Sequence, residues 1–280
     1  MDWGRVRSYR LSGIVLHRRD HGEADRLITL LTPDRGKVVF RAPGVRKVTS
    51  RKAGHLELFT HVRVQVAKGR TWDVITQAET LHAFPHIRGS LKRTGHAYFV
   101  AELLLRFAPE GQGDPALFDL ALKTFHYVDQ APNLLLVSRW FEAQVLRLAG
   151  FQPQLYTCVA CHTPLSMGEA LHWFPPGGGV LCPSCATGQE AARPLPPRVL
   201  KLMRFLQDHT FEEVSHPPIP LDLLREVESY MLDYLRTVLE RDLRSMTFIR
   251  RLRRELKANA SPPLSSTLTL QQETAEPEES

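Results

Sequence analysis

The four cysteines of this 280-residue chain stand in two pairs, Cys158-Val-Ala-Cys161 and Cys182-Pro-Ser-Cys185, with twenty residues between the pairs. Two CxxC pairs at this spacing are typical of a zinc ribbon, in which each pair supplies two thiolates to one tetrahedral ion. Four thiolates close the coordination sphere and leave no position for water, so we expect one zinc ion with a structural role. Because the segment between the pairs is rich in Pro and Gly, we expect metal binding to stabilise its fold.

Other chemistries of these residues fit the sequence less well. A disulfide framework is disfavoured because the N-terminus has no apolar signal core, and neither CxxC pair has the strand-to-helix setting of a redox motif. His55-Leu56-Glu57 has the H-x-E form of nucleobase deaminases, but Thr157 stands where those enzymes need Pro before the first cysteine. The glycines at 177–179 lack the Lys and Ser/Thr of a phosphate-binding loop. We therefore expect no catalytic residue and no enzyme activity.

A second concentration of chemistry is the basic segment of residues 41–52, which contains no acid. Pro43 and Gly44 mark it as a loop, and its few apolar residues predict that it is mobile. Mobile cations of this kind can follow a phosphate backbone and release its counterions, although a loop that only aids solubility is the alternative. The candidate nucleic-acid contacts are Arg41, Arg46, Lys47, Arg51 and Lys52, with Arg35 and Lys37 just before them.

The first 80 residues must position that loop, and they read as five short strands. Apolar runs and alternation predict strands at residues 14–16, 27–31, 38–40, 58–67 and 72–78. Five strands in this length are typical of a partly open OB-fold β-barrel, which we place at residues 1–82. Residues 1–80 carry a net charge of +8, whereas the whole chain carries +6, so the barrel holds the positive field. Aromatic side chains that could stack on bases, or belong to the core, are Trp3, Tyr9, Phe40, Phe59 and Trp72.

The remainder has helical periodicity, which makes the whole an α+β multidomain chain. We predict a helical bundle in two parts, residues 83–154 and 191–258, with the zinc ribbon inserted at 155–190. Asp114-Pro115 predicts a helix start and Gly150 a helix end. We expect the arginines of the bundle, Arg139 among them, to lie on solvated helix faces. We expect the same of those in residues 244–257, for which a second polyanion contact is the alternative. The Lys- and Arg-free stretch at 259–280 predicts a disordered acidic tail.

Composition narrows the partners. A sequence pI near 9.3 favours a polyanion such as nucleic acid, although a solvated basic surface would give the same value. No apolar run approaches the roughly 18 residues of a membrane helix, so we expect a cytoplasmic protein without a membrane partner, monomeric on its own. These features equally allow an RNA-binding barrel protein with a zinc ribbon.

The run from Gly13 to Lys47 resembles the N-terminal domain of the RecO family of bacterial recombination-repair mediators. The matching features are the strand Gly13-Ile-Val-Leu, the residues Glu23, Asp25 and Leu27, the Thr32 turn with Gly36, and Gly44 with Arg46. The likeness is specific over about the first 80 residues, and the domain order that follows is that of many members. Pro43 departs from it, because relatives often place Lys before the Gly. The change removes one cation and one backbone donor, so we expect the loop's phosphate contacts to be arranged differently.

The resemblance implies an OB-fold and, for this chain, the zinc-containing branch of the family, since not every relative keeps the cysteines. It further implies a protein that binds single- and double-stranded DNA and anneals complementary strands. It implies partners too: RecR, the tail of single-strand-binding protein and, indirectly, the RecA recombinase that is loaded onto coated DNA. Such a protein would associate with the nucleoid.

Overall fold

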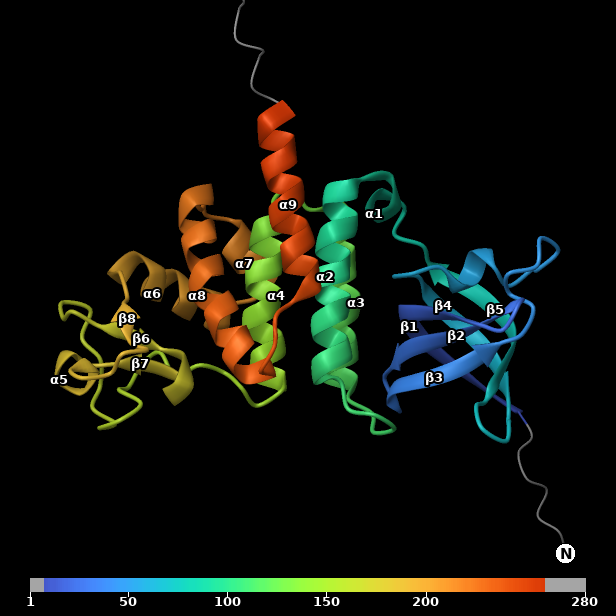
Figure 1. Cartoon of the computed structure of the whole chain (residues 1–280), viewed down its shortest axis with the longest axis horizontal. Helices are drawn as coiled ribbons and strands as arrows, with labels where there is room; N and C mark the ends of the chain where they lie inside the picture. Colours follow the sequence, from blue (N-terminus) through green and yellow to red (C-terminus); the bar gives the residue numbers. More distant parts are fainter. Residues whose placement is uncertain (1–7, 260–280) are drawn as a thin grey trace, which may run out of the picture.

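The computed structural model describes residues 8–259, which form a row of three regions (Figure 1). A β-barrel lies at one end, helices fill the middle and a small cysteine-bearing module lies at the other end. The chain is therefore of the α+β class, as its patterning predicted. Trp3 lies outside the described residues, as does the predicted tail from residue 260 on.

The N-terminal region is a closed barrel of five strands. They are β1 (Ser8–His21), β2 (Asp25–Thr32), β3 (Gly36–Ala42), β4 (His61–Ala67) and β5 (Val74–His82). Their order is β1-β2-β3-β5-β4, and β3 and β5 complete the circle through one parallel pair, Arg41 with Val74. The barrel is therefore closed, but only a single residue pair joins these two strands. The OB-fold expected for this region is confirmed.

Strand β1 makes closure possible because it belongs to both sides of the barrel. Its first half pairs with β4 from Ser8 to Ile14, and its second half pairs with β2 from Ile14 to His21. The register shifts between Val15 and His17, and such a bulge bends a strand and increases its twist. The three-residue strand predicted at 14–16 is thus only the centre of a strand of fourteen residues.

The strand predicted at 58–67 begins three residues later, at His61. Phe59 has φ +67°, in the left-handed region that a regular strand excludes. Its amide donates to the Val15 oxygen at 2.8 Å, and its ring contacts those of Tyr98 and Phe125 in the helical region. The chain turns at Phe59 so that this side chain can leave the barrel, and alternation alone did not show that.

The helical region contains the predicted helices with small shifts at their ends. Asp114 accepts from the Leu117 amide at 3.0 Å, and Gly150 has φ +79°, so the predicted start and end are confirmed. The helices are α1 (Pro85–Gly89), α2 (Leu91–Phe107), α3 (Pro115–Gln130), α4 (Leu134–Leu148), α6 (Pro197–Asp208), α7 (Phe211–Ser215), α8 (Leu221–Leu239) and α9 (Arg244–Asn259).

Two apolar clusters hold these regions together. One fills the barrel interior around Phe40, Val64 and Ile75. The other runs through the helices into the cysteine module, and it also takes in Ile14 and Leu31 from the outer face of the barrel. The barrel therefore packs against the helices over shared core instead of being connected to them by a linker alone.

The expectation that the bundle's arginines are solvated was wrong for Arg139. Its side chain is fully buried in α4, with Nη2 2.5 Å from Oε1 of the equally buried Glu142 and Nη1 3.5 Å from Glu228 of α8. Glu228 also accepts from Arg253 of α9 at 2.9 Å through both carboxylate oxygens. Arg253 is therefore an interhelical contact, although the sequence placed it on an exposed face.

Helix α9 is fixed at its start as well. Glu102 of α2 accepts from the amides of Arg244 and Ser245 at 3.0 and 2.9 Å, so a side chain from another helix caps α9. Among residues 8–259, no helix has both the length and the apolar character that crossing a bilayer requires.

Candidate metal centre and nucleic-acid interface

The cysteine module is a small sheet fastened to α8. Its strands are β6 (His172–Phe174), β7 (Gly179–Leu181) and β8 (Arg193–Pro194), in the order β7-β6-β8, and the short helix α5 (Pro183–Ala186) follows β7. Trp173 on β6 is fully buried and its ring contacts Tyr230 and Tyr234 of α8. Arg193 of β8 also pairs with Asp233 of α8 at 2.5 Å, so the module is attached to this helix by both apolar and charged contacts.

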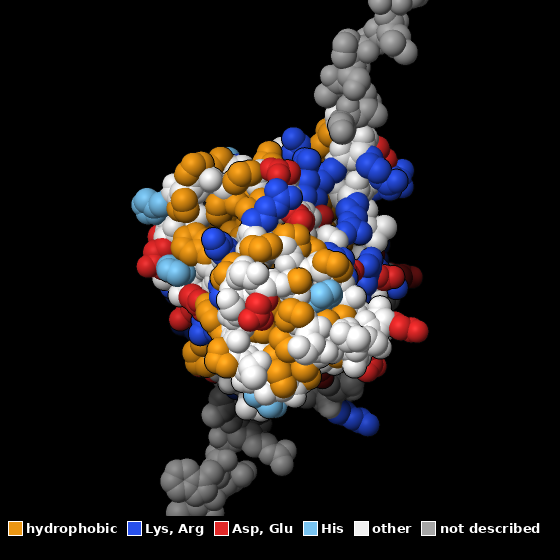
Figure 2. All heavy atoms as spheres, turned by 90° about the vertical axis from the view of Figure 1, so that its left-hand side faces the viewer, with side chains coloured by type: hydrophobic (Ala, Val, Ile, Leu, Met, Phe, Trp, Pro, Cys, Tyr) orange, Lys and Arg blue, Asp and Glu red, His pale blue; other side chains and the backbone are white. Residues whose placement is uncertain are grey.

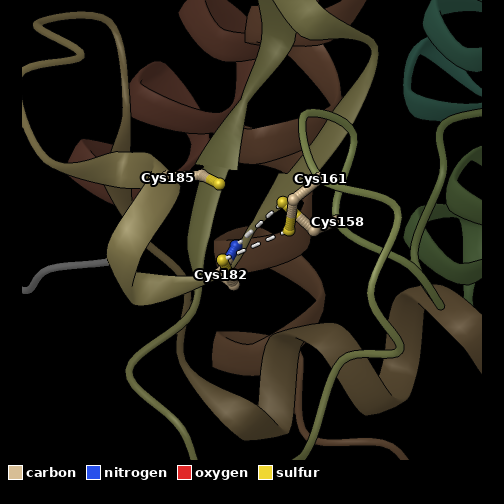
Figure 3. Close-up of side chains that lie close together, drawn as sticks. All are labelled: Cys158, Cys161, Cys182 and Cys185. Atoms are coloured by element: carbon tan, nitrogen blue, oxygen red, sulfur yellow. Dashed lines mark hydrogen bonds between the residues drawn. The ribbon is translucent and has the colours of Figure 1, made fainter.

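The four cysteines meet between the loop of Cys158 and Cys161 and the start of α5, which carries Cys185 and directly follows Cys182, as Figure 3 shows. Their sulfur atoms all lie within 4.8 Å of one another, and Sγ of Cys161 and Cys182 are 3.8 Å apart. Tetrahedral zinc with Zn–S bonds of about 2.3 Å requires sulfur atoms about 3.8 Å apart, so the cluster has the dimensions of a metal site with four thiolate ligands. The structure thus brings together all four residues that the spacing singled out.

The thiols of the cluster differ in how readily they ionise. Burial alone would raise the pKa of Cys158, but the main-chain N–H groups of Cys161, Cys182 and Ala160 lower it to about 6. By contrast, hydrogen bonding with Cys182 and Cys161 raises the pKa of Cys185 to about 12. The pKa of Cys161 is lowered as well, chiefly by hydrogen bonding with Thr163. A bound dication would favour the thiolate form of all four residues.

The motif His55-Leu56-Glu57 has no part in this centre. His55 Nδ1 lies 2.9 Å from Thr80 Oγ1, and Glu57 pairs with Arg18 at 2.5 Å, all within the barrel. The barrel and the cysteine module lie at opposite ends of the molecule (Figure 1). Glu57, the residue that would be the general acid of such a motif, therefore does not lie beside these cysteines.

At the barrel end, the basic loop is anchored more firmly than its composition predicted. Asp25 accepts from the Gly44 amide at 2.8 Å and from Arg41 Nε at 2.8 Å, and these partners, Gly44 first, lower the pKa of its carboxyl. The Arg46 amide donates to the Ala24 oxygen at 2.9 Å, and Val45 is buried in the barrel core. The expectation of a mobile loop is thus not matched by these contacts, and Asp25 is the positioning residue that the loop's own sequence could not show.

Three of the candidate cations project from this anchored loop. Arg46, Lys47 and Arg51 are exposed. Arg46 lies 3.5 Å from Asp20, whereas Lys47 and Arg51 have no ion pair among the described side chains. Arg41 is half exposed but shares the Asp25 carboxylate at 2.7 Å. The loop therefore presents a small positive surface whose tips are Lys47 and Arg51.

The other candidates make contacts within the protein. Lys52 donates to the Ile75 oxygen at 3.0 Å, and burial lowers the pKa of its ammonium. Lys37 donates to the Leu105 oxygen of α2 at 2.9 Å and pairs with Glu110 at 3.3 Å. The Arg35 guanidinium lies over the ring of Tyr9, 4.2 Å from its centre. The structure therefore does not bring these three into the surface formed by the loop tips.

The aromatic candidates mostly belong to the protein interior. Phe40 and Phe59 are buried, and Tyr9 is covered by Arg35 and hydrogen-bonded to Asp73 at 2.5 Å. Trp72 is half-buried with its ring edge against His21. Among the described aromatic candidates, Trp72 is thus the one with a partly open face on the barrel.

Comparison with known proteins covers both halves of the chain. Residues 6–84 match the family described as recombination protein O N terminal, and residues 88–247 match recombination protein O C terminal. A protein of Roseiflexus sp. strain RS-1 named DNA repair protein RecO is 39% identical over 267 residues, covering 95% of this chain and 93% of its own length.

Proteins of the same name from two other organisms are similar over nearly as much of this chain. That of Dehalococcoides mccartyi is 32% identical over 246 residues, covering 88% of this chain and 96% of its own length. That of Symbiobacterium thermophilum is 33% identical over 249 residues, with 88% and 98% covered. Both family matches agree with the barrel and the helical region found here, and the chain belongs to the RecO family of DNA repair proteins.

Proposed function

We propose that this chain is a recombination mediator without enzyme activity that binds single- and double-stranded DNA and anneals complementary strands. The observation that carries the proposal is the anchored loop of Arg46, Lys47 and Arg51, which a closed OB-fold barrel of this family presents to solvent. Annealing requires that two phosphate backbones be neutralised while the base edges stay free. Cationic side chains on a rigid loop can contact phosphate without reading bases.

The seven predicted cations have different parts in this proposal. Arg46, Lys47 and Arg51 contact the backbone directly, and Arg41 holds the loop through Asp25. Lys37, Lys52 and Arg35 add to the positive field while their heads remain bound to the protein. We propose that Cys158, Cys161, Cys182 and Cys185 bind one zinc ion, which stabilises the module and takes no part in chemistry.

The partners and the cellular location that we propose follow from membership of the family. We propose that the protein acts with RecR in loading RecA onto DNA coated by single-strand-binding protein, contacts the tail of that protein, and works in the cytoplasm at the nucleoid. The division into a barrel at 1–82, helical parts at 83–154 and 191–258, and a zinc ribbon at 155–190 is proposed with it. Strand β5 ends at His82 and helix α1 begins at Pro85, which is compatible with the boundary between the barrel and the first helical part.

Parallel titrations test the nucleic-acid partner. Labelled single-stranded DNA, duplex DNA and RNA of one sequence are titrated with the full chain, and annealing of complementary DNA strands is followed in the same buffer. Tight DNA binding with accelerated annealing supports the proposal. Strong preference for RNA without any acceleration of annealing would instead assign the chain to the RNA-binding class.

A further inference from the structure

A groove with an apolar floor crosses the helical region where four helices meet. It has a volume of about 420 Å³ and lies between α2, the start of α4, the start of α8 and the outer end of α9. Its floor is formed by Leu134, Leu135, Leu221, Ile249, Leu252 and Leu256. Leu221 is 54% exposed and Leu256 is 40% exposed, so two large apolar side chains face water at one place. Burying such a surface would be favourable.

The edge of the groove is cationic. Lys92 of α2, Arg225 of α8 and Arg253 of α9 line it, and no Asp or Glu is among its described lining residues. Arg253 is bound to Glu228, whereas Lys92 and Arg225 make no ion pair within residues 8–259. An apolar floor with such an edge suits a segment that carries both acidic and apolar side chains.

Arginines of α9 extend the positive surface beside this groove. Arg254 is exposed near the end of the helix, and Arg250 and Arg251 are exposed although they pair with Glu228 at 3.9 Å and with Glu255. Figure 2 shows Lys and Arg side chains gathered at the top of the molecule, over the end of α9 seen in Figure 1. The surface near the groove therefore attracts a negatively charged chain from that end.

The chain itself supplies such a segment at the same end. Helix α9 ends at Asn259, three residues after Leu256 of the groove floor, and residues 260–280 follow. These residues contain no Lys or Arg and carry leucines followed by glutamates. The residues concerned are Leu264, Leu268 and Leu270, then Glu273, Glu276, Glu278 and Glu279.

We propose that residues 260–280 dock into this groove, with their leucines against Leu221 and Leu256 and their glutamates against Lys92 and Arg225. Reach is sufficient, because 21 residues can span up to about 70 Å and the groove begins within one turn of Asn259. Attachment makes the docking intramolecular, and a short tether gives an effective concentration on the order of millimolar. Even a weak interaction would then keep the groove covered.

A regulatory consequence follows. Any acidic and apolar segment of another protein that fits this groove must first displace residues 260–280, so the chain's own segment sets a threshold for that partner. A nucleic acid is the competing occupant, because its phosphates would also meet Lys92 and Arg225. It offers no apolar side chains for the exposed leucines, and for that reason the acidic segment fits the groove better.

Footprinting of the full-length protein tests the docking directly. Acetylation of Lys92 by a limiting amine-reactive reagent is followed by mass spectrometry in the wild type and in a variant with all four glutamates changed to Gln and the three leucines to Ser. We expect Lys92 to react several-fold more slowly in the wild type, while exposed Lys201 of α6 reacts equally in both. Equal rates at Lys92, or slowing only after DNA is added, would overturn the proposal.

Binding of a labelled peptide of residues 260–280 is a second, independent test of the groove. We expect it to bind the tail-substituted full-length protein about tenfold more tightly than the wild type, whose own segment competes. Adding Lys92→Glu and Arg225→Glu to the substituted protein should abolish binding, and Lys201→Glu should not. Absence of peptide binding to the substituted protein, or binding that the groove changes leave intact, would show that the segment docks elsewhere or nowhere.

Discussion

Lys37 Nζ of β3 lies 2.9 Å from the main-chain oxygen of Leu105 near the end of α2. The next residue toward the N-terminus, Gly36, has φ +57°, and a Cβ atom there would come within 2.4 Å of the Pro109 oxygen. The Lys37 amide also donates to that oxygen at 2.8 Å. The start of β3 is thus joined to the end of α2. Lys37, which the sequence analysis named as a candidate DNA contact, therefore links the barrel to the helical region.

Changing Lys37 to Met should therefore lower stability more than it lowers DNA affinity. The variant loses a charge-assisted bond to a helix C-terminus, worth about 1 kcal/mol for a half-buried side chain. Urea denaturation measures the loss, and Lys47→Met, at an exposed site without an ion pair, is the matched control. A loss of DNA affinity at Lys37→Met equal to that at Lys47→Met would show that Lys37 contacts phosphate after all.

Changing Arg46, Lys47 and Arg51 together to Ala should flatten the salt dependence of DNA binding. Each phosphate contact on a single strand contributes about 0.7 to the slope of log affinity against log salt, so three lost contacts reduce it by about 2. Lys52 is left in place because its bond to the Ile75 oxygen supports the barrel. Titrations at four salt concentrations give the slope, and an unchanged slope would remove the loop from the binding surface.

Cys158→Ser should lower zinc content and melting temperature together. A closed thiolate shell contributes its binding energy to folding, so losing one ligand weakens both. Metal analysis and thermal unfolding are measured on the same sample, with His162→Asn, next to Cys161 and outside the ligand set, as the control. One zinc per chain and an unshifted melting temperature in Cys158→Ser would contradict the closed site.

Acidification should destabilise the barrel–helix junction through His61. Burial, followed by the neighbouring His82, His126 and Arg63, lowers the pKa of His61 to about 4, against about 6.5 in the unfolded chain. The contribution of neutral, buried His61 to the free energy of unfolding is fully present above pH 6.5. It is lost as the pH falls toward 4, at about 1.4 kcal/mol per pH unit. The free energy of unfolding measured from pH 7 to 5 should depend less on pH in His61→Phe. The exposed-site variant His17→Gln should keep the wild-type dependence, and a His61→Phe curve parallel to the wild type would contradict the assignment.

Arg139→Met should cost about 3–5 kcal/mol, because it leaves the Glu142 carboxylate buried without its partner. Burial already raises the pKa of that carboxyl despite Arg139 beside it. The double variant Arg139→Met with Glu142→Leu removes both charges and should recover most of the loss. Arg251→Ala breaks an exposed pair and should leave the free energy of unfolding nearly unchanged. A double variant no more stable than Arg139→Met would refute this reading of the pair.

The sequence by itself determined the features that depend on near neighbours. The spacing of Cys158 to Cys185 placed four sulfur atoms within 4.8 Å, because each CxxC turn fixes two of them locally. The N-cap at Asp114 and the helix end at Gly150 followed from local hydrogen-bonding and backbone signals. Apolar runs and alternation located the five strands, and the resemblance to the RecO N-terminal domain was needed to identify them as an OB-fold barrel.

Only the tertiary structure decided the contacts between residues far apart in the chain. Whether Arg139 is buried depends on Glu228, 89 residues away, and whether Lys37 faces solvent depends on Leu105, 68 residues away. A long cationic side chain on an amphipathic pattern is compatible with a solvated surface or a buried pair, and local spacing does not distinguish the two. For the same reason the loop's anchor at Asp25 and the groove between four helices appear only when those elements are packed together.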